Sequence, residues 1–312
     1  MKSDKELIHW LLQGDTAIQY QTRRDLLKAS STSLRKLQAR ISIEGWGARF
    51  LSKQDKKGHW GRGYYQPKWT STHYTLMDLK NLCLPRDNSQ TRLIINKLLS
   101  ERIDEEGSVN YSPTSKSDVC INGMVLSFSA YFGAPEEKLR SIIDYLLKRQ
   151  MADSAWNCED YRGAVHGSLH TTMSVLEGFL ELKKWGYSYR QAEREEAAEK
   201  GRGFMLTHSL FKSDKTGEII DKRFLMLSYP SRWRYDILRG LDYLREAEVP
   251  CDSRMQPALE VLRKKRRKEG TWPLQQRHPG AVHFDMEETG KASRWNTLRA
   301  LRTLRQYPQN QL

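Results

Sequence analysis

The sequence has no long apolar stretch. None of its apolar runs approaches the ~20 residues that a helix needs to span a bilayer. The N-terminal stretch 1–17 is charged and has only a short apolar part, so it does not have the pattern of a signal peptide. These absences argue against a membrane-spanning or secreted protein, and we expect a soluble, cytoplasmic one.

The chain is also poor in cysteine. Its four cysteines, in 312 residues, form no C-x-x-C pair and no closely spaced framework. Disulfide scaffolds are typical of short secreted chains, so we expect all four thiols to be reduced. They are Cys83, Cys120, Cys158 and Cys251.

Acidic residues are outnumbered by basic ones. The chain has 52 lysine and arginine residues against 38 aspartate and glutamate residues, which gives a formal net charge of +14. A field of this sign attracts phosphorylated small molecules and other polyanions. No nucleic-acid-binding motif is recognisable, which argues against nucleic acid as the partner.

The chain contains a repeat. Leucine and basic residues lead into a polar turn with Gly or Ser, and the turn ends in a large apolar residue. Such turns end at Trp60, Val109, Trp156 and Trp272, and the last gap leaves room for a divergent unit around 213–221. A period of about 50 residues is typical of arrays of helical hairpins.

A second, more apolar helix is expected after each turn, and few segments alternate with the period of two that strands show. We therefore predict an all-α fold of helical hairpins in one continuous domain (46–312), with an N-terminal helical segment (1–45) that completes it. Helices that are apolar over most of their circumference favour a ring of inner and outer helices, an α/α toroid, over an open solenoid. Matching leucines of the expected inner helices are Leu76, Leu126, Leu176, Leu238 and Leu298.

Three stretches carry a family resemblance: 58–79, 154–179, and 270–276 together with 293–301. Each combines a G-x-W-type turn with a loop and a helix of the T-x-x-(A/G)-L type. This pattern resembles the repeat of the prenyltransferase and squalene-cyclase superfamily, over roughly residues 40–305. The resemblance implies an α/α toroid whose inner helices surround an apolar central cavity.

The motifs of the superfamily's cyclases are missing. A D-x-D-D motif would protonate an alkene, and a D-D-x-x-D motif would place magnesium on a diphosphate, but neither occurs in the chain. We therefore do not expect a terpene cyclase that works by either chemistry.

Asp118, Cys120 and His170 indicate a metal site. Cys120 and His170 each lie six residues before a matched leucine, so they are expected at equivalent positions of consecutive inner helices. Asp118 lies two residues before Cys120. A carboxylate, a thiolate and an imidazole suit Zn²⁺, and three protein ligands with an open fourth position are the catalytic arrangement. Zinc would also lower the pKa of a substrate thiol and hold it as a nucleophile.

The same residues resemble the zinc site of protein prenyltransferase β subunits. In that family a D-x-C pair begins one inner helix and a His-Thr pair begins the next. Asp118 with Cys120, and His170 with Thr171, match this order here. We expect Thr171 and His166 to contact the metal ligands and orient them without binding the metal themselves.

Residues near the starts of the inner helices are expected to bind substrate, because helix N-termini and arginine forks both favour anionic groups. His73 lies deeper in its helix and could line the cavity. The expected set is Lys68, Lys116, Arg232, Trp233, Arg234 and His73. Cys158 follows the Trp156 turn and is expected to lie away from the helix starts.

The favoured function is a zinc-dependent, prenyltransferase-like transferase. Its substrate would be an isoprenoid or another lipid-like anionic molecule, and a protein or peptide thiol is a further candidate. The alternative is a non-catalytic toroid that binds a lipid or a protein, with structural zinc or none. The sequence does not specify the oligomeric state, a partner subunit or catalytic residues beyond the metal site.

Overall fold

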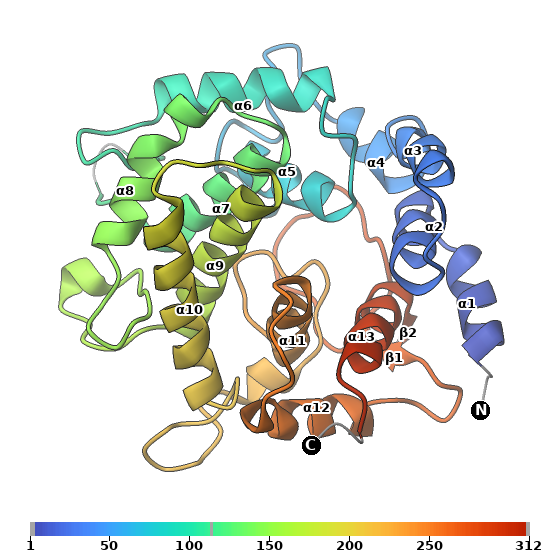
Figure 1. Cartoon of the computed structure of the whole chain (residues 1–312). Coiled ribbons are helices and arrows are strands. Elements are labelled where there is room, and N and C mark those ends of the chain that lie inside the picture. The colour runs from blue at the N-terminus through green and yellow to red at the C-terminus, as the bar shows by residue number, and fades with distance from the viewer. Residues whose placement is uncertain (1–3, 113–114, 310–312) are drawn as a thin grey trace. The chain divides into compact units, whose positions relative to one another are not determined.

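The computed structural model describes residues 4–112 and 115–309 (Figure 1). Within that part, thirteen α-helices are joined by loops and short helical turns, and only two short strands, β1 (Trp272–Pro273) and β2 (Ala292–Ser293), form a sheet. The all-α fold class predicted from the sequence is therefore confirmed.

The chain divides into two compact units. Unit 1 contains residues 1–53, 81–85 and 208–312, and unit 2 contains residues 54–80 and 86–207. Closure of the hairpins into a toroid involves both units, so it stays a prediction, as does the single continuous domain.

Unit 2 is built around two apolar helices, α7 (Val119–Tyr131) and α9 (Leu169–Lys184). In α7 only Cys120 is not buried, whereas the neighbouring α8 (Arg140–Lys148) buries one face. This is the division into inner and outer helices that the sequence predicts. The other helices of unit 2 are η2 (Lys68–Thr70), α5 (Thr72–Asn81, whose last residue belongs to unit 1), α6 (Ser89–Glu101), η3 (Glu136–Lys138), η4 (Asp160–Arg162) and α10 (Gln191–Thr207).

A recurring hydrogen bond explains the sequence repeat. The residue that ends each matched turn is fully buried, and its backbone N–H donates to a side-chain oxygen in the first turn of the next inner helix. The pairs are Trp60 to Thr72 (3.1 Å), Val109 to Asn122 (2.7 Å), Trp156 to Thr172 (3.0 Å) and Trp272 to Thr297 (3.0 Å). Each turn is thereby fixed against the start of the helix that follows it.

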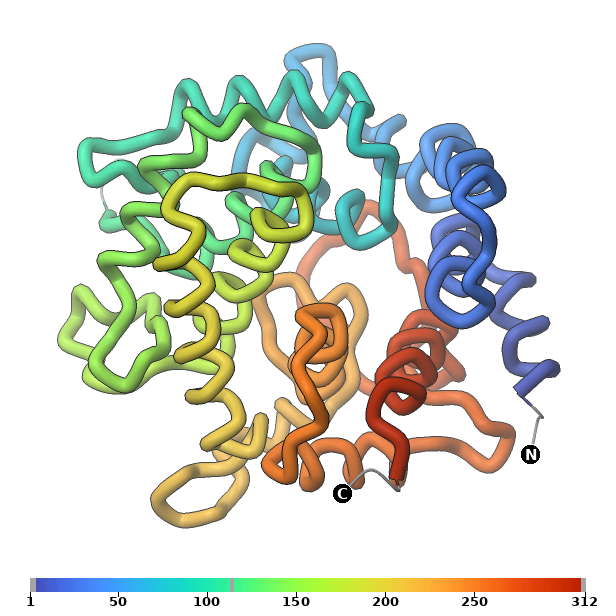
Figure 2. The backbone as a smooth tube through the Cα atoms, in the orientation of Figure 1, coloured from blue at the N-terminus to red at the C-terminus, as the bar shows by residue number. Residues whose placement is uncertain are grey.

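Unit 1 joins the two ends of the chain. Its N-terminal helices contact α13 (Arg294–Gln306), as the blue and red parts of Figure 2 show, and α13 in turn packs against α11 (Ile237–Glu246). The remaining elements of unit 1 are α1 (Asp4–Leu12), α2 (Thr16–Gln21), the π-helical η1 (Thr22–Leu26), α3 (Ser31–Arg40), α4 (Gly45–Leu51), η5 (Lys222–Leu225), η6 (Ser253–Met255) and α12 (Gln256–Lys264).

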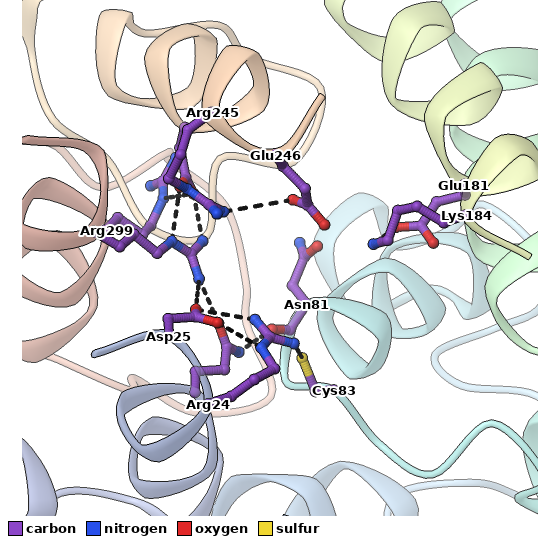
Figure 3. Close-up of polar contacts among 12 residues, drawn as sticks. Arg24, Asp25, Asn81, Cys83, Glu181, Lys184, Arg245, Glu246 and Arg299 are labelled. Atoms are coloured by element: carbon purple, nitrogen blue, oxygen red, sulfur yellow. Dashed lines mark hydrogen bonds and ion pairs between the residues drawn. The ribbon is translucent and has the colours of Figure 1, made fainter. Parts of the chain in front are cut away.

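A buried network of charges holds these segments together. Arg302 of α13 forms paired hydrogen bonds with Asp242 of α11 and lies 2.7 Å from Asp25 of η1. Arg245 and Arg299 lie 3.0 Å and 3.4 Å from the same Asp242 carboxylate. Figure 3 labels Asp25, Arg245 and Arg299 of this network.

Candidate functional site

The predicted Cys120 and His170 occupy equivalent positions of two packed helices. Each is the second residue of its helix, α7 or α9, and each lies two residues before the residue that binds the preceding turn. The two helices pack closely at Gly123 of α7, which has no side chain. A Cβ added there would lie only 2.6 Å from the backbone of Ser174 in α9. The helix starts that carry Cys120 and His170 therefore belong to one closely packed pair.

Cys158 lies against this position, although the sequence places it elsewhere. Its sulfur accepts a hydrogen bond from the backbone N–H of Cys120 (3.1 Å), one from the Thr171 hydroxyl (3.4 Å) and one from the Cys120 thiol. The prediction that Cys158 lies away from the helix starts is wrong. The cause is the bond between Trp156 and Thr172, which brings the loop after Trp156 onto the start of α9.

The two thiols differ in their readiness to ionise. The hydrogen bond from the Cys120 thiol, helped by Thr171 and by the Cys120 amide, lowers the pKa of Cys158 against the opposing effect of burial. The same thiol hydrogen bond, together with burial, raises the pKa of Cys120 well above its ordinary value. A negative charge on the pair therefore resides first on the sulfur of Cys158.

Asp118 and Lys68 contribute opposite charges near the thiols. Asp118 occupies the N-cap position of α7 but makes no side-chain capping bond. Burial raises the pKa of its carboxyl group, and the ammonium of Lys68 acts in the opposite direction. The Lys68 Nζ lies 5.8 Å from the ring centre of Tyr65 and 5.3 Å from that of Trp69.

An aromatic cluster adjoins this charged group. Tyr65 stacks on Tyr111 with ring centres 5.1 Å apart, and its hydroxyl lies 3.2 Å from that of Tyr74. His73, which is fully buried, has its Nδ1 3.0 Å from the Tyr111 hydroxyl. Burial, with a smaller effect of Lys68, lowers the pKa of His73 to about 3. His73 is therefore neutral at physiological pH, and its predicted role in lining a substrate cavity stays a prediction.

The residue types at the starts of α7 and α9 suit zinc, but their side chains are not arranged around a common point. The Cys158 sulfur lies against the Cys120 amide, and Asp118 and His170 lie at the starts of the same two helices, which together is a donor set that zinc accepts. Among the described residues, however, no group of three or more His, Cys, Asp or Glu side chains is arranged so that it could hold a metal ion. The three-ligand site of Asp118, Cys120 and His170 thus stays a prediction.

The remaining predicted residues of unit 2 lie at different places. Thr171 is buried and its hydroxyl donates a hydrogen bond to the Cys158 sulfur, while its role behind the metal ligands stays a prediction. His166 is exposed in the loop before α9, where its carbonyl accepts a hydrogen bond from Asn157. Lys116 is exposed and lines an open polar hollow of about 680 Å³, which acidic side chains such as Glu105 also line. Acidic neighbours weaken the case for Lys116 as an anion ligand.

Arg232, Trp233 and Arg234 belong to unit 1, in the segment that leads into α11. Arg232 is buried and adopts a left-handed backbone conformation with φ of 56°. Burial, followed by the guanidinium groups of Arg234 and Arg232, lowers the pKa of His278 to about 4. These basic residues therefore form a local positive group within unit 1, and their role in substrate binding stays a prediction.

A signal for Cys158 was present in the sequence. Cys158 lies two residues after the Trp156 turn, and Tyr111 lies two residues after the Val109 turn. Tyr111 reaches back to His73 near the start of α5, just as Cys158 reaches back to Cys120 near the start of α7. The repeat therefore predicts that the second residue after a turn contacts the preceding inner helix.

Comparisons with known proteins assign the chain to no family. No protein-family model matches the chain, and no curated protein matches it. Among solved structures, the type II terpene cyclase MstE from Scytonema, in complex with the product merosterolic acid A, is similar at 12% sequence identity and a TM-score of 0.31. The match covers 86% of this chain and 94% of that one. A likeness of this degree does not establish a shared fold or function.

Within the described residues, no helix combines the length and apolarity that crossing a membrane requires.

Proposed function

We propose that unit 2 binds one zinc ion through Cys120 and Cys158, with Asp118 or His170 as the third ligand and the fourth position open. The observation that carries this proposal is the position of Cys158, whose sulfur lies 3.1 Å from the backbone nitrogen of Cys120 at the start of α7. Thiolates are strong zinc ligands, and a pair of them that is already close together needs little ordering to bind the ion. Cys120 is a ligand predicted from the sequence, and Cys158 is a further candidate that the fold brings next to it.

We further propose that the chain is a prenyltransferase-like transferase that acts on an isoprenoid or other lipid-like anionic molecule. Zinc, when bound, would lower the pKa of a substrate thiol. The protein's own residues would hold the rest of the substrate. Stacked Tyr65 and Tyr111 offer an apolar surface, and the Lys68 ammonium offers a positive charge at its edge. Thr171 would keep the Cys158 sulfur in place through its hydroxyl.

The count of protein ligands separates this function from a second candidate. If Asp118, Cys120, Cys158 and His170 all bind, coordination is closed, which is typical of structural zinc sites. The chain would then be a non-catalytic module that binds a lipid or a protein. The presence of Cys158 is the specific observation that favours this second candidate, because it supplies a fourth donor.

Metal analysis tests the zinc site. Protein prepared without a histidine tag is expected to contain about one zinc ion per chain, and both Cys120→Ala and Cys158→Ala are expected to lose it. Cys251→Ala is the matched control, because Cys251 is also half-buried but belongs to unit 1. Zinc-free wild-type protein, or full zinc in Cys120→Ala, would contradict the site.

X-ray absorption at the zinc edge then counts the ligands. An open site is expected to show two sulfur ligands that become three when a small thiol is added, which supports the transferase. A site that keeps two sulfurs in excess thiol is closed, and supports the binding module.

A further inference from the structure

The contact between Cys120 and Cys158 has a consequence that does not require a metal. Both residues are partly rather than fully buried. The Cys158 sulfur accepts a hydrogen bond from the backbone N–H of Cys120 at 3.1 Å. Cysteines this close can form a disulfide by side-chain rotation, without the backbone movement that distant cysteines need.

We propose that Cys120 and Cys158 form an oxidation-sensitive pair that closes to a disulfide when the protein meets hydrogen peroxide. In the first step the Cys158 sulfur attacks one peroxide oxygen, the O–O bond breaks, and the second oxygen leaves as water after taking up a proton. The product is a sulfenic acid on Cys158. In the second step the Cys120 sulfur attacks that sulfur, the S–O bond breaks and a second water leaves. Two thiols and one peroxide thus give one disulfide and two waters.

The structure assigns different roles to the two cysteines. Cys158 is the attacking residue because two donors, the Cys120 amide and the Thr171 hydroxyl, point at its sulfur. Cys120 is the resolving residue because its backbone nitrogen lies 3.1 Å from that sulfur. The other two cysteines belong to unit 1, where Cys83 accepts a hydrogen bond from Arg24.

The regulatory meaning of this disulfide rests on the proposed function. Oxidation removes two sulfurs from the donor set that would bind zinc, so the oxidised protein is expected to release the ion. Thiol reductants reverse the step by exchange and restore both sulfurs. The zinc site would therefore be switched off by peroxide and on by reduction.

The test uses full-length protein that has been reduced and freed of metal by a chelator. After brief treatment with a small excess of hydrogen peroxide, the number of free thiols is expected to fall from four per chain to two. Peptide mass spectrometry is expected to find Cys120 linked to Cys158, while Cys83 and Cys251 remain alkylatable. Free Cys120 and Cys158 after treatment, or a linkage of either to Cys83 or Cys251, would overturn the proposal.

Single substitutions test the assignment of roles. Cys120→Ser is expected to trap the sulfenic acid, so that dimedone labels Cys158, whereas Cys158→Ser is expected to leave Cys120 unlabelled. Cys251→Ser is the control and keeps the disulfide. Because the wild-type measurement involves no substitution, a misfolded variant cannot decide the result. Zinc content is measured separately, so a protein that forms the disulfide but never binds zinc contradicts the proposed function alone.

Discussion

Arg302 illustrates how single residues hold unit 1 together. Its side chain is only 9% exposed, and it contacts Asp242 and Asp25 at once. Burial by itself raises the pKa of Asp242. The guanidinium groups of Arg302 and Arg245 lower it by more than burial raises it, so the net pKa lies far below its ordinary value. Removing one partner of such a pair leaves buried charge behind, which costs more than the pair itself contributes.

Arg302→Met is therefore expected to lower the free energy of unfolding by about 3–5 kcal/mol, measured by urea denaturation at neutral pH. Arg254→Met is the matched control in the same unit, because Arg254 is 49% exposed and its partner Asp252 is its near neighbour in the chain. Exposed pairs are typically worth about 1 kcal/mol or less. Equal losses in the two variants would mean that the network adds no stability beyond that of a surface ion pair.

At the scale of elements, much of the hairpin pattern is readable from the sequence. All five matched leucines are fully buried in the structure, in the five helices where they are expected. The register differs from the expected one in the last hairpin. There Thr297 binds the Trp272 turn as Thr172 binds the Trp156 turn. Leu176 lies one helical turn after Thr172, and the residue one turn after Thr297 is Leu301, not Leu298. Leucine spacing alone cannot separate these choices, because several leucines of one helix face the same core.

The site shows the same limit at closer range. The equivalent positions of Cys120 and His170 follow from apolar periodicity, which depends on residues near in sequence. The approach of Cys158 depends on how a loop docks between two helices, which apolar periodicity does not describe; the signal in the sequence is its place two residues after a turn, which Tyr111 shares. Composition likewise gives the excess of basic residues, but it does not reveal that Lys116 lies among acidic side chains.

The close packing of α7 against α9 leads to a prediction at this scale. Gly123→Ala is expected to destabilise the protein by about 1–3 kcal/mol, because the added methyl group would lie 2.6 Å from the Ser174 backbone, which cannot move as a side chain can. Gly203→Ala in α10 is the control: no atom lies within 4 Å of its added Cβ, so the better helix propensity of alanine should stabilise by up to about 1 kcal/mol. Chemical denaturation of both variants checks the difference. Similar stability of the two would show that α7 and α9 can separate at little cost.

The whole molecule is expected to lose stability in mild acid through buried histidines. His73 in unit 2 and His278 in unit 1 have pKa values lowered to about 3 and about 4, in both cases mainly by burial. In the unfolded chain a histidine takes up its proton near pH 6.5, whereas these two stay neutral in the folded protein until the pH is far lower. Their contribution is therefore fully present above about pH 6.5 and is lost as the pH falls toward about 4.

This sign gives a measurable slope. The free energy of unfolding is expected to fall between pH 6.5 and pH 4.5, by on the order of 1 kcal/mol per pH unit for each buried histidine. His278→Gln removes one titrating group, so its curve should be flatter than that of the wild type over this range, whatever its stability at neutral pH. The pKa values of Asp25 and Asp242 are lowered, so their contributions are lost only in stronger acid. Burial raises the pKa values of Asp15 and Glu287, which opposes the slope equally in the wild type and in the variant, so the difference between the two curves reports His278. An unchanged slope in His278→Gln would mean that this histidine already binds its proton in the folded state, and that burial and the neighbouring arginines do not keep it neutral.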